Sequence, residues 1–240
     1  MTRVLDGDTI VVATGEGEID VRLAGINAPE GDECSGDEAT DELKGAVEDR
    51  AVRLEVLGTD QFERTLAFVS ESGRNINLEM VRLGLAIVTT PSSAEFLEAE
   101  RDAATAKLGL WAPGSCSSGP LPQIVISDAT VDPPGRDEEN LGAETVTLHN
   151  PSGVKVNIGG WVLRDESSRH RFTFQGGSIL DAGASITVTS ADRGWDPGDS
   201  PVWNNDGDIV MLLDRHGRVV DHWRYPEPEA DARGALTWLG

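Results

Sequence analysis

Apolar and polar residues alternate along the start of the chain in a pattern typical of short β-strands. Two such runs, residues 4–13 and 19–26, are rich in β-branched residues and are joined by the turn sequence GEGE at 15–18. A further turn at Asp6-Gly7-Asp8 interrupts the first run. These features predict a β-meander at the N-terminus.

Beyond the meander, apolar residues recur at helical spacing in three segments, and two strands lie between the first and the second. The strands are expected at 52–57 and from Arg64 to a turn at Ser72-Gly73. Five strands with interleaved helices predict a small α+β barrel. The apolar helix positions are Ala39, Leu43 and Ala46, then Leu78, Met80, Val81 and Leu83, then Phe96, Leu97 and Ala104.

From Ile124 onward the pattern changes to short alternating runs separated by turn sequences, which predicts an all-β sandwich. A Pro-, Gly- and Ser-rich stretch precedes this change and is typical of a linker. The runs are 124–131, 144–150, 154–158, 161–165, 170–174, 185–190, 208–214 and 219–225. The predicted domains are therefore 1–113 and 122–226, with a linker at 114–121 and an acidic Pro-rich tail at 227–240.

Acidic residues outnumber basic ones by 42 to 20 among 240 residues, which gives a formal net charge of -22. Such a field repels a polyanion, so any action on nucleic acid requires a local exception. Only Lys44, Lys107 and Lys155 are lysines, a bias that resembles proteins of salt-loving archaea. High salt would screen the repulsion. An acidic protein from a GC-rich genome is the alternative.

The chain contains no apolar run long enough to span a membrane and no recognisable signal peptide. The first predicted strand follows Met1 almost directly, so we expect an export segment upstream of this start and a secreted or envelope-associated protein. A cytoplasmic location is the alternative. A disulfide between Cys34 and Cys116 would fit export and would enclose most of the first domain. Two unpaired buried thiols are the other interpretation.

The N-terminal hairpin concentrates the candidate chemistry. Asp6 and Asp8 fall on one face of a strand or turn, and Asn27 can bring a third oxygen, a donor set that suits Ca²⁺ or Mg²⁺. Arg22 offers a planar fork of donors to a phosphate, and Glu30 is a carboxylate available for general-base work. Together they fit phosphodiester hydrolysis. Taken singly, each could instead be a turn or surface residue.

The first domain resembles the staphylococcal nuclease (thermonuclease) family over about residues 2–113. The resemblance rests on DGDT at 6–9, Arg22, NAPE at 27–30, Arg64 in FERTLAFV, and the segments NINLEMVRLGLAIV and LGLW. It implies an OB-fold barrel and a Ca²⁺-dependent endonuclease acting on DNA and RNA. The implied Ca²⁺ ligands are Asp8, Asn27 and the Ala28 carbonyl, with Asp6 near the metal; Arg22 and Arg64 hold phosphate, and Glu30 is the base candidate.

Two positions depart from that family's pattern. Asn27 stands where an aspartate is usual, so the residue keeps an oxygen ligand but brings no negative charge, and metal affinity should be weaker. Phe62 stands where a phosphate-binding tyrosine is expected, and the tyrosines that would stack on a base are missing after Ile87. Base preference therefore does not carry over.

The second half resembles a lamin-tail domain, an immunoglobulin-like β-sandwich, over about residues 122–226. The motifs are Asn150-Pro151, Gly160-Trp161 and the WNN run at 203–205. Trp161 and Trp223 lie in alternating strands and are expected in the core. The histidines share no metal-ligand spacing and are interpreted as surface or hydrogen-bonded residues: His149, His170, His216 and His222.

The sequence thus predicts a Ca²⁺-dependent nuclease whose second domain targets the enzyme or presents substrate, with an envelope or protein partner as its candidate ligand. The alternative from another class is a catalytically silent adaptor that binds nucleic acid or protein, which Asn27, the missing tyrosines and the acidity favour. A purely structural surface protein is a third interpretation.

Overall fold

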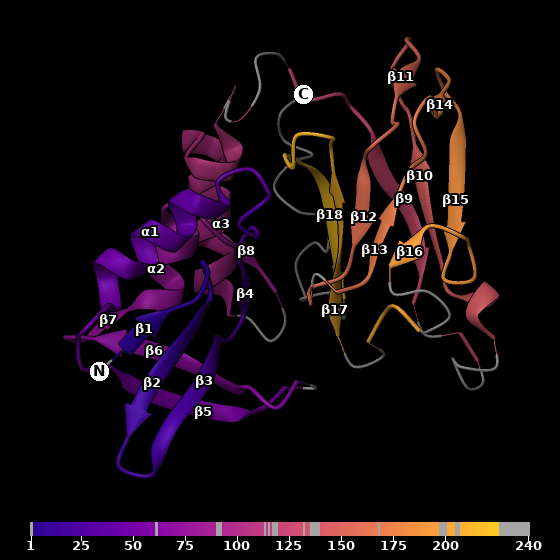
Figure 1. Ribbon diagram of the computed structural model, residues 1–240. Helices are drawn as coiled ribbons and strands as arrows, with labels where there is room; N and C mark the ends of the chain where they lie inside the picture. The colour runs from indigo at the N-terminus through magenta and orange to yellow at the C-terminus, as the bar shows by residue number, and fades with distance from the viewer. Residues whose placement is uncertain are drawn as a thin grey trace. The chain divides into compact units, whose positions relative to one another are not determined.

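A computed structural model gives the fold as two compact units, residues 1–118 and 119–240 (Figure 1). Each unit is considered by itself. The structure describes residues 2–60, 62–89, 93–112, 114, 116, 120–131, 133–134, 140–167, 169–196, 201–204 and 207–225. The predicted tail at 227–240 and half of the predicted linker at 114–121 lie outside the described residues.

The first unit is built on a mixed six-stranded sheet with the order β1-β2-β3-β6-β5, and β7 adds to β6. All its ladders are antiparallel except the one between β3 and β6. A separate two-stranded ladder joins β4 to β8. The strands are β1 (Thr2–Val4), β2 (Thr9–Thr14), β3 (Gly17–Leu23), β4 (Ile26–Asn27), β5 (Arg53–Thr59), β6 (Thr65–Glu71), β7 (Arg74–Asn75) and β8 (Ile87–Val88).

Three helices pack against this sheet on one side, as Figure 1 shows, and supply much of the core. They are α1 (Gly36–Val47), α2 (Ile76–Arg82) and α3 (Ala94–Ala106), followed by a short 3₁₀ turn, η1 (Gly109–Trp111). The apolar stripes predicted for α1 and α3 are confirmed, because Ala39, Leu43, Phe96 and Ala104 are buried. Leu83, by contrast, caps α2 and is exposed.

The prediction of five strands is corrected by this arrangement. The extra strands, β4, β7 and β8, are only two residues long, and such short segments carry no periodicity that a sequence pattern could show. Among the described residues no ladder joins β1 to β5, so the sheet itself is open and mixed.

The described part of the second unit consists of strands and one 3₁₀ turn, and its strands form antiparallel sheets around one core. A five-stranded sheet has the order β16-β13-β12-β17-β18, a three-stranded sheet the order β15-β10-β9, and β11 pairs with β14. The strands are β9 (Val125–Thr130), β10 (Thr145–His149), β11 (Val156–Asn157), β12 (Val162–Arg164), β13 (Arg171–Thr173), β14 (Ile179–Leu180), β15 (Ser185–Thr189), β16 (Trp195–Asp196), β17 (Asp208–Leu213) and β18 (Val219–Tyr225), with a 3₁₀ turn, η3 (Leu141–Ala143), before β10.

Tryptophans contribute to the core of the second unit. Trp161 is buried, as predicted, whereas Trp223 is half-buried against the same cluster.

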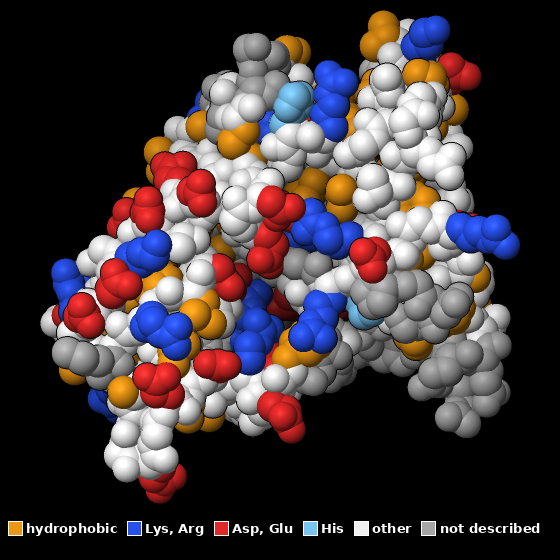
Figure 2. All heavy atoms as spheres, viewed as in Figure 1, with side chains coloured by type: hydrophobic (Ala, Val, Ile, Leu, Met, Phe, Trp, Pro, Cys, Tyr) orange, Lys and Arg blue, Asp and Glu red, His pale blue; other side chains and the backbone are white. Residues whose placement is uncertain are grey.

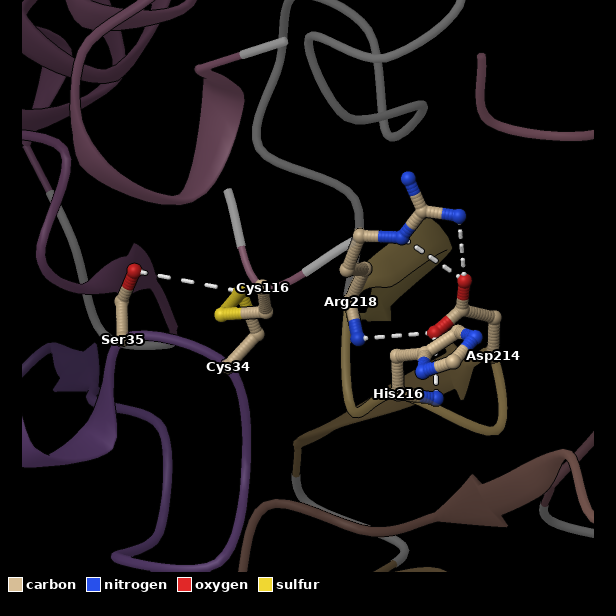
Figure 3. The surroundings of a disulfide bond; sticks show 6 residues. All are labelled: Cys34, Ser35, Cys116, Asp214, His216 and Arg218. Carbon is tan, nitrogen blue, oxygen red and sulfur yellow. Dashed lines mark hydrogen bonds and ion pairs between the residues drawn. A yellow bond between two sulfur atoms is a disulfide. The ribbon is translucent and has the colours of Figure 1, made fainter. Parts of the chain in front are cut away.

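The β17–β18 hairpin is held by Asp214, whose Oδ2 accepts from Arg218 Nε at 2.8 Å and whose Oδ1 accepts the backbone N–H of His216 (Figure 3). These bonds satisfy the polar groups of a tight turn at the end of a buried strand.

Cys34 and Cys116 form a disulfide in the first unit, with Cα atoms 5.7 Å apart and a separation of 82 positions in sequence (Figure 3). Cys34 lies just before α1, and Cys116 follows η1. In the described part of the chain, no helix is both long and apolar enough to cross a bilayer.

Candidate active site

A tight turn at Asp6-Gly7-Asp8 leads into β2 and brings two carboxylates together. The backbone N–H of Asp8 donates to Asp6 Oδ1 at 3.0 Å, and Thr9 Oγ1 donates to Asp8 Oδ1 at 3.1 Å. Gly7 is required here, because a Cβ at this position would lie 2.7 Å from the Cβ atoms of both Ala28 and Ala39. The turn is therefore packed directly against α1 and the segment after β4.

Asp8 is buried at the centre of the site. Its Oδ2 accepts the backbone N–H of Ala28 at 2.7 Å and lies 2.6 Å from Arg22 Nη1. The pKa of Asp8 is raised to about 7, chiefly by burial and also by the negative charges of Asp6 and Glu30, against the lowering effects of the Arg22 charge and the Ala28 N–H. A cation bound beside Asp8 would favour its ionised form.

The sheet places Arg22 next to Asp8. Arg22 lies on β3, opposite Thr9 of β2 on one side and Leu66 of β6 on the other. The backbone N–H of Leu23 donates to the Asp8 carbonyl at 2.8 Å, which ties the end of β3 to the aspartate turn. The guanidinium is almost fully buried, so its position is determined by the sheet and by the ion pair.

The segment after β4 completes this group. Asn27, buried on β4, pairs in register with Ile87 of β8, and Ala28 follows with its N–H directed at Asp8. Glu30 is half-buried and close enough for its charge to act on Asp8. The structure thus brings Asp6, Asp8, Arg22, Ala28 and Glu30 together.

Arg64 lies just before β6, beside the strand that carries Arg22. Its guanidinium donates through Nε to Asp60 Oδ2 at 2.7 Å and sits over the Phe62 ring, 5.4 Å from the centroid. Asp60 Oδ1 also accepts the backbone N–H groups of Phe62 and Arg64. The register that places Thr65 opposite Val21 puts Arg64 one residue from that pair. No described contact links Arg64 to Asp8 or Glu30.

Two supporting residues were not predicted. Glu33 is buried, and its Oε2 accepts the backbone N–H of Glu30 at 3.2 Å. Asp60 holds Arg64, and its position four residues before the arginine in DQFER was the available signal. Glu33 had no such signal, because its function depends on a turn that the residue itself helps to form.

The donor set fits a hard divalent cation. The described residues contain no cluster of three or more His, Cys, Asp or Glu side chains arranged to hold a metal ion. Asp8 and Asp6, the Asn27 amide and the Ala28 carbonyl would instead supply two carboxylates and two neutral oxygens, which Ca²⁺ accepts. The pKa of Asp8 is raised to about 7, chiefly by burial, so the carboxyl must lose its proton to bind a cation.

The surface charge is mixed around the first unit. Figure 2 shows Asp and Glu side chains spread over the visible face of this unit, with Lys and Arg side chains between them. Arg22 and Arg64 are each paired with a carboxylate. The site therefore combines buried, oriented charges with a surrounding surface of mixed charge.

Comparisons with known proteins match both units. The sequence model of the family described as Staphylococcal nuclease homologue matches residues 20–113, and that of the Lamin Tail Domain matches residues 117–227. An uncharacterized endonuclease of Haemophilus influenzae is 39% identical over 115 residues, which are 47% of this chain and 65% of that protein. The chain thus spans less than two thirds of this relative's length.

Two other relatives match the same region. A micrococcal nuclease of Shigella flexneri is 34% identical over 124 residues, covering 46% of this chain and 71% of the relative. An uncharacterized endonuclease of Escherichia coli is 34% identical over 114 residues, covering 46% of this chain and 74% of the relative. The similarity to these proteins covers less than half of the chain.

Proposed function

Because the chain belongs to the staphylococcal nuclease homologue family and continues into a lamin tail domain, we propose that it is a Ca²⁺-dependent endonuclease that hydrolyses phosphodiester bonds of DNA and RNA. The observation that carries the proposal is the buried Asp8–Arg22 pair with Glu30 beside it. The two finer fold assignments, an OB-type barrel and an immunoglobulin-like sandwich, are part of this proposal.

In this proposal each residue has a distinct task. Glu30 orients water and accepts its proton as the water attacks phosphorus. Arg22 and Arg64 stabilise the charge that develops on the phosphoryl oxygens, because a guanidinium donates in a planar fork. Asp8 orients Arg22 through an ion pair of 2.6 Å, and Asp60 orients Arg64 through a hydrogen bond of 2.7 Å.

Asp8, Asp6, Asn27 and the Ala28 carbonyl would hold Ca²⁺, which supplies Lewis-acid stabilisation of the phosphate when it is bound. Asn27 adds no charge to this set, so its members must bind the ion with two carboxylates at most. We therefore expect a modest affinity. Ionisation of Asp8, with its pKa of about 7, should accompany binding, and affinity should rise with pH through this range.

The remaining parts of the proposal concern location and partners. The net charge of -22 supports activity in high salt, where the repulsion between protein and nucleic acid is screened. The disulfide between Cys34 and Cys116 supports a secreted or envelope-associated location. The second unit would then target the enzyme to an envelope or protein partner or present substrate to it.

The test is cleavage of single-stranded DNA by the full chain in molar salt, with Ca²⁺ and then with chelator. Glu30→Gln removes the base but keeps size and polarity, so turnover should fall by about 10²–10⁴-fold. Glu42→Gln, an exposed position on α1, is the matched control and should cleave like the wild type. Calcium-independent cleavage, or full activity in Glu30→Gln, would overturn the mechanism.

Arg64→Ala separates binding from chemistry. If Arg64 acts mainly on the transition state, kcat should fall more than KM rises. A rise in KM with kcat unchanged in Arg64→Ala would assign the residue to ground-state binding alone.

A catalytically silent adaptor is the second candidate. It is favoured by Asn27, by Phe62 in place of a tyrosine, and by the pairing of both arginines with carboxylates. Retention of nucleic acid without cleavage at any salt concentration would support this candidate and refute the first.

A further inference from the structure

The candidate base Glu30 begins a compact turn that closes on itself before α1. The backbone N–H of Glu33 donates to the Glu30 carbonyl at 2.9 Å, and the N–H of Gly36 donates to the Glu33 carbonyl at 3.1 Å. In return, Glu33 Oε2 accepts the N–H of Glu30 at 3.2 Å. Glu33 is buried and Glu30 is half-buried. The bond from the Glu30 N–H to the buried Glu33 side chain therefore anchors the backbone of Glu30.

The same turn is pressed against the first residue of α1. A Cβ on Gly36 would lie 1.8 Å from the Glu30 carbonyl oxygen, so only glycine allows the helix to start this close to the turn. Ala39, one turn along α1, contacts the aspartate turn at Gly7. The position of Glu30 relative to Asp8 therefore depends on how the turn is seated on α1.

The disulfide provides a covalent connection from this turn to a distant part of the first unit. Cys34 is a member of the turn and is buried. Its partner Cys116 follows η1, and η1 is attached to the end of α2 by a bond from the Leu110 N–H to the Gly84 carbonyl at 2.8 Å. Figure 3 shows the Cys34 and Cys116 side chains joined, with Ser35 beside them. The other described bonds of the turn either stay within residues 30–36 or join its end to α1, where the Ala39 N–H donates to the Ser35 carbonyl and Thr40 Oγ1 donates to the Gly36 carbonyl, each at 2.9 Å.

We propose that Glu33 and the Cys34–Cys116 disulfide are positioning elements for Glu30, so that hydrolysis depends on the oxidised state of the disulfide. This inference rests on the proposed function, because it takes Glu30 as the base. Reduction by a dithiol would break the S–S bond and give two thiols, and the dithiol would be oxidised to its own disulfide with transfer of two electrons and two protons.

The geometry predicts which kinetic constant changes. Arg22 and Arg64 are held by the sheet and by Asp8 and Asp60, and none of these contacts involves the turn. Reduction should therefore leave substrate binding in place and displace only Glu30. A displacement of about 1 Å can cost about 10²-fold in rate, so we expect kcat to fall by about 10–100-fold with KM within about twofold of its oxidised value.

The first experiment compares the full chain before and after treatment with dithiothreitol, with single-stranded DNA and Ca²⁺ in molar salt. Circular dichroism checks that the reduced chain stays folded at the assay temperature. The double variant Cys34→Ser/Cys116→Ser should have the low kcat of the reduced wild type and should not respond to dithiothreitol. Equal kcat in the oxidised and reduced chains, or a change in KM alone, would overturn the proposal.

Glu33 is tested by a pair of substitutions. Glu33→Gln keeps an oxygen that can accept the Glu30 N–H, whereas Glu33→Ala removes the acceptor. We expect Glu33→Ala to lower kcat about tenfold or more and Glu33→Gln to retain most of it, with Glu42→Ala as an exposed control on α1. Equal losses in the alanine and glutamine variants would exclude a positioning role through this bond.

Failure of the proposed function is distinguishable from failure of this inference. If the oxidised chain cleaves nothing, the nuclease proposal fails, and amide hydrogen exchange of residues 28–36 still decides the inference. Exchange in this segment should become faster on reduction or in Glu33→Ala. Unchanged exchange would overturn the positioning role whatever the activity.

Discussion

Asn77 connects α2 to the sheet beneath the candidate site, and its replacement gives a sharp test of how the first unit is held together. The side chain is fully buried. Its Oδ1 accepts the Val69 N–H at 2.9 Å, and its Nδ2 donates to the Ala24 carbonyl at 2.9 Å and the Ala67 carbonyl at 3.2 Å. Ala24 lies in the turn between Arg22 and Asn27, so this residue supports the segment that carries the site.

The cost of Asn77→Ala follows from the groups that it leaves unpaired. Ala67 keeps a bond from the Ala24 N–H, but the Val69 N–H and the Ala24 carbonyl each lose the bond to Asn77. A buried group left unsatisfied costs about 1–3 kcal/mol, which gives about 2–6 kcal/mol for the two groups. A domain has about 5–15 kcal/mol of stability in total, so the variant should approach the limit of folding.

Asn77→Asp adds a pH signature to this test. The aspartate can still accept from Val69, but its second oxygen would face two carbonyl oxygens in a buried position, which raises the carboxyl pKa. With a folded pKa above the unfolded value, the loss of stability is largest at neutral pH. This loss shrinks as pH falls through the folded pKa, because the protonated group can donate to Ala24.

The assay is urea unfolding in molar salt, followed by the far-UV helix signal. The described α-helices all belong to the first unit, so this signal reports mainly on that unit. Asn75→Ala is the matched control, because Asn75 caps α2 through a bond to the Leu78 N–H and its loss should cost about 1 kcal/mol. A cost for Asn77→Ala no larger than this control, or a pH-independent Asn77→Asp, would refute the reasoning.

Three further perturbations test other parts of the chain. Gly7→Ala forces a Cβ to within 2.7 Å of Ala28 and Ala39, so we expect the free energy of unfolding in urea to fall by about 1–3 kcal/mol. Adding Ala39→Gly should restore part of this loss. An unchanged urea midpoint in Gly7→Ala would show that the turn accommodates the extra methyl group without strain. Burial, and then a neighbouring arginine charge, holds the pKa of His222 well below 6.5, so its contribution to stability is complete above the unfolded pKa of about 6.5 and is lost as pH falls below it. As pH decreases, the midpoint temperature of thermal unfolding should therefore fall less steeply in His222→Gln than in the wild type. Parallel plots of midpoint against pH would contradict this. Asn27→Asp should tighten Ca²⁺ binding in calorimetric titration, whereas an identical titration curve would show that residue 27 is not a ligand.

The sequence predicted those parts of the fold that depend on local pattern. The helices α1 and α3 were predicted because their buried residues recur at helical spacing, and the aspartate turn because DGD has specific turn chemistry. The strand expected at 154–158 forms only as β11 (Val156–Asn157). The length of a strand depends on its partner, and β14 is equally short.

The candidate site was predicted as a set of residues but not as a set of contacts. Asp6, Asp8, Arg22 and Glu30 were grouped because they lie within one short N-terminal segment and because their spacing resembles that of the nuclease family. The direct ion pair between Asp8 and Arg22 depends on the register of β2 and β3 and on burial. These are properties of the folded sheet, and no local pattern encodes them.

The pairing between distant strands also determines when the site can exist during synthesis. Arg22 gains its neighbour on β6 only after residue 66 has been made, and Asn27 pairs with Ile87 on β8. Because pairing across such separations needs both segments outside the ribosome, the nascent chain displays its acidic hairpin long before that hairpin has a sheet around it. Closure by Cys116 comes later still. In the proposed enzyme, the nuclease site would therefore be incompletely assembled, beside the ribosome and its messenger RNA, for most of the translation of the first unit.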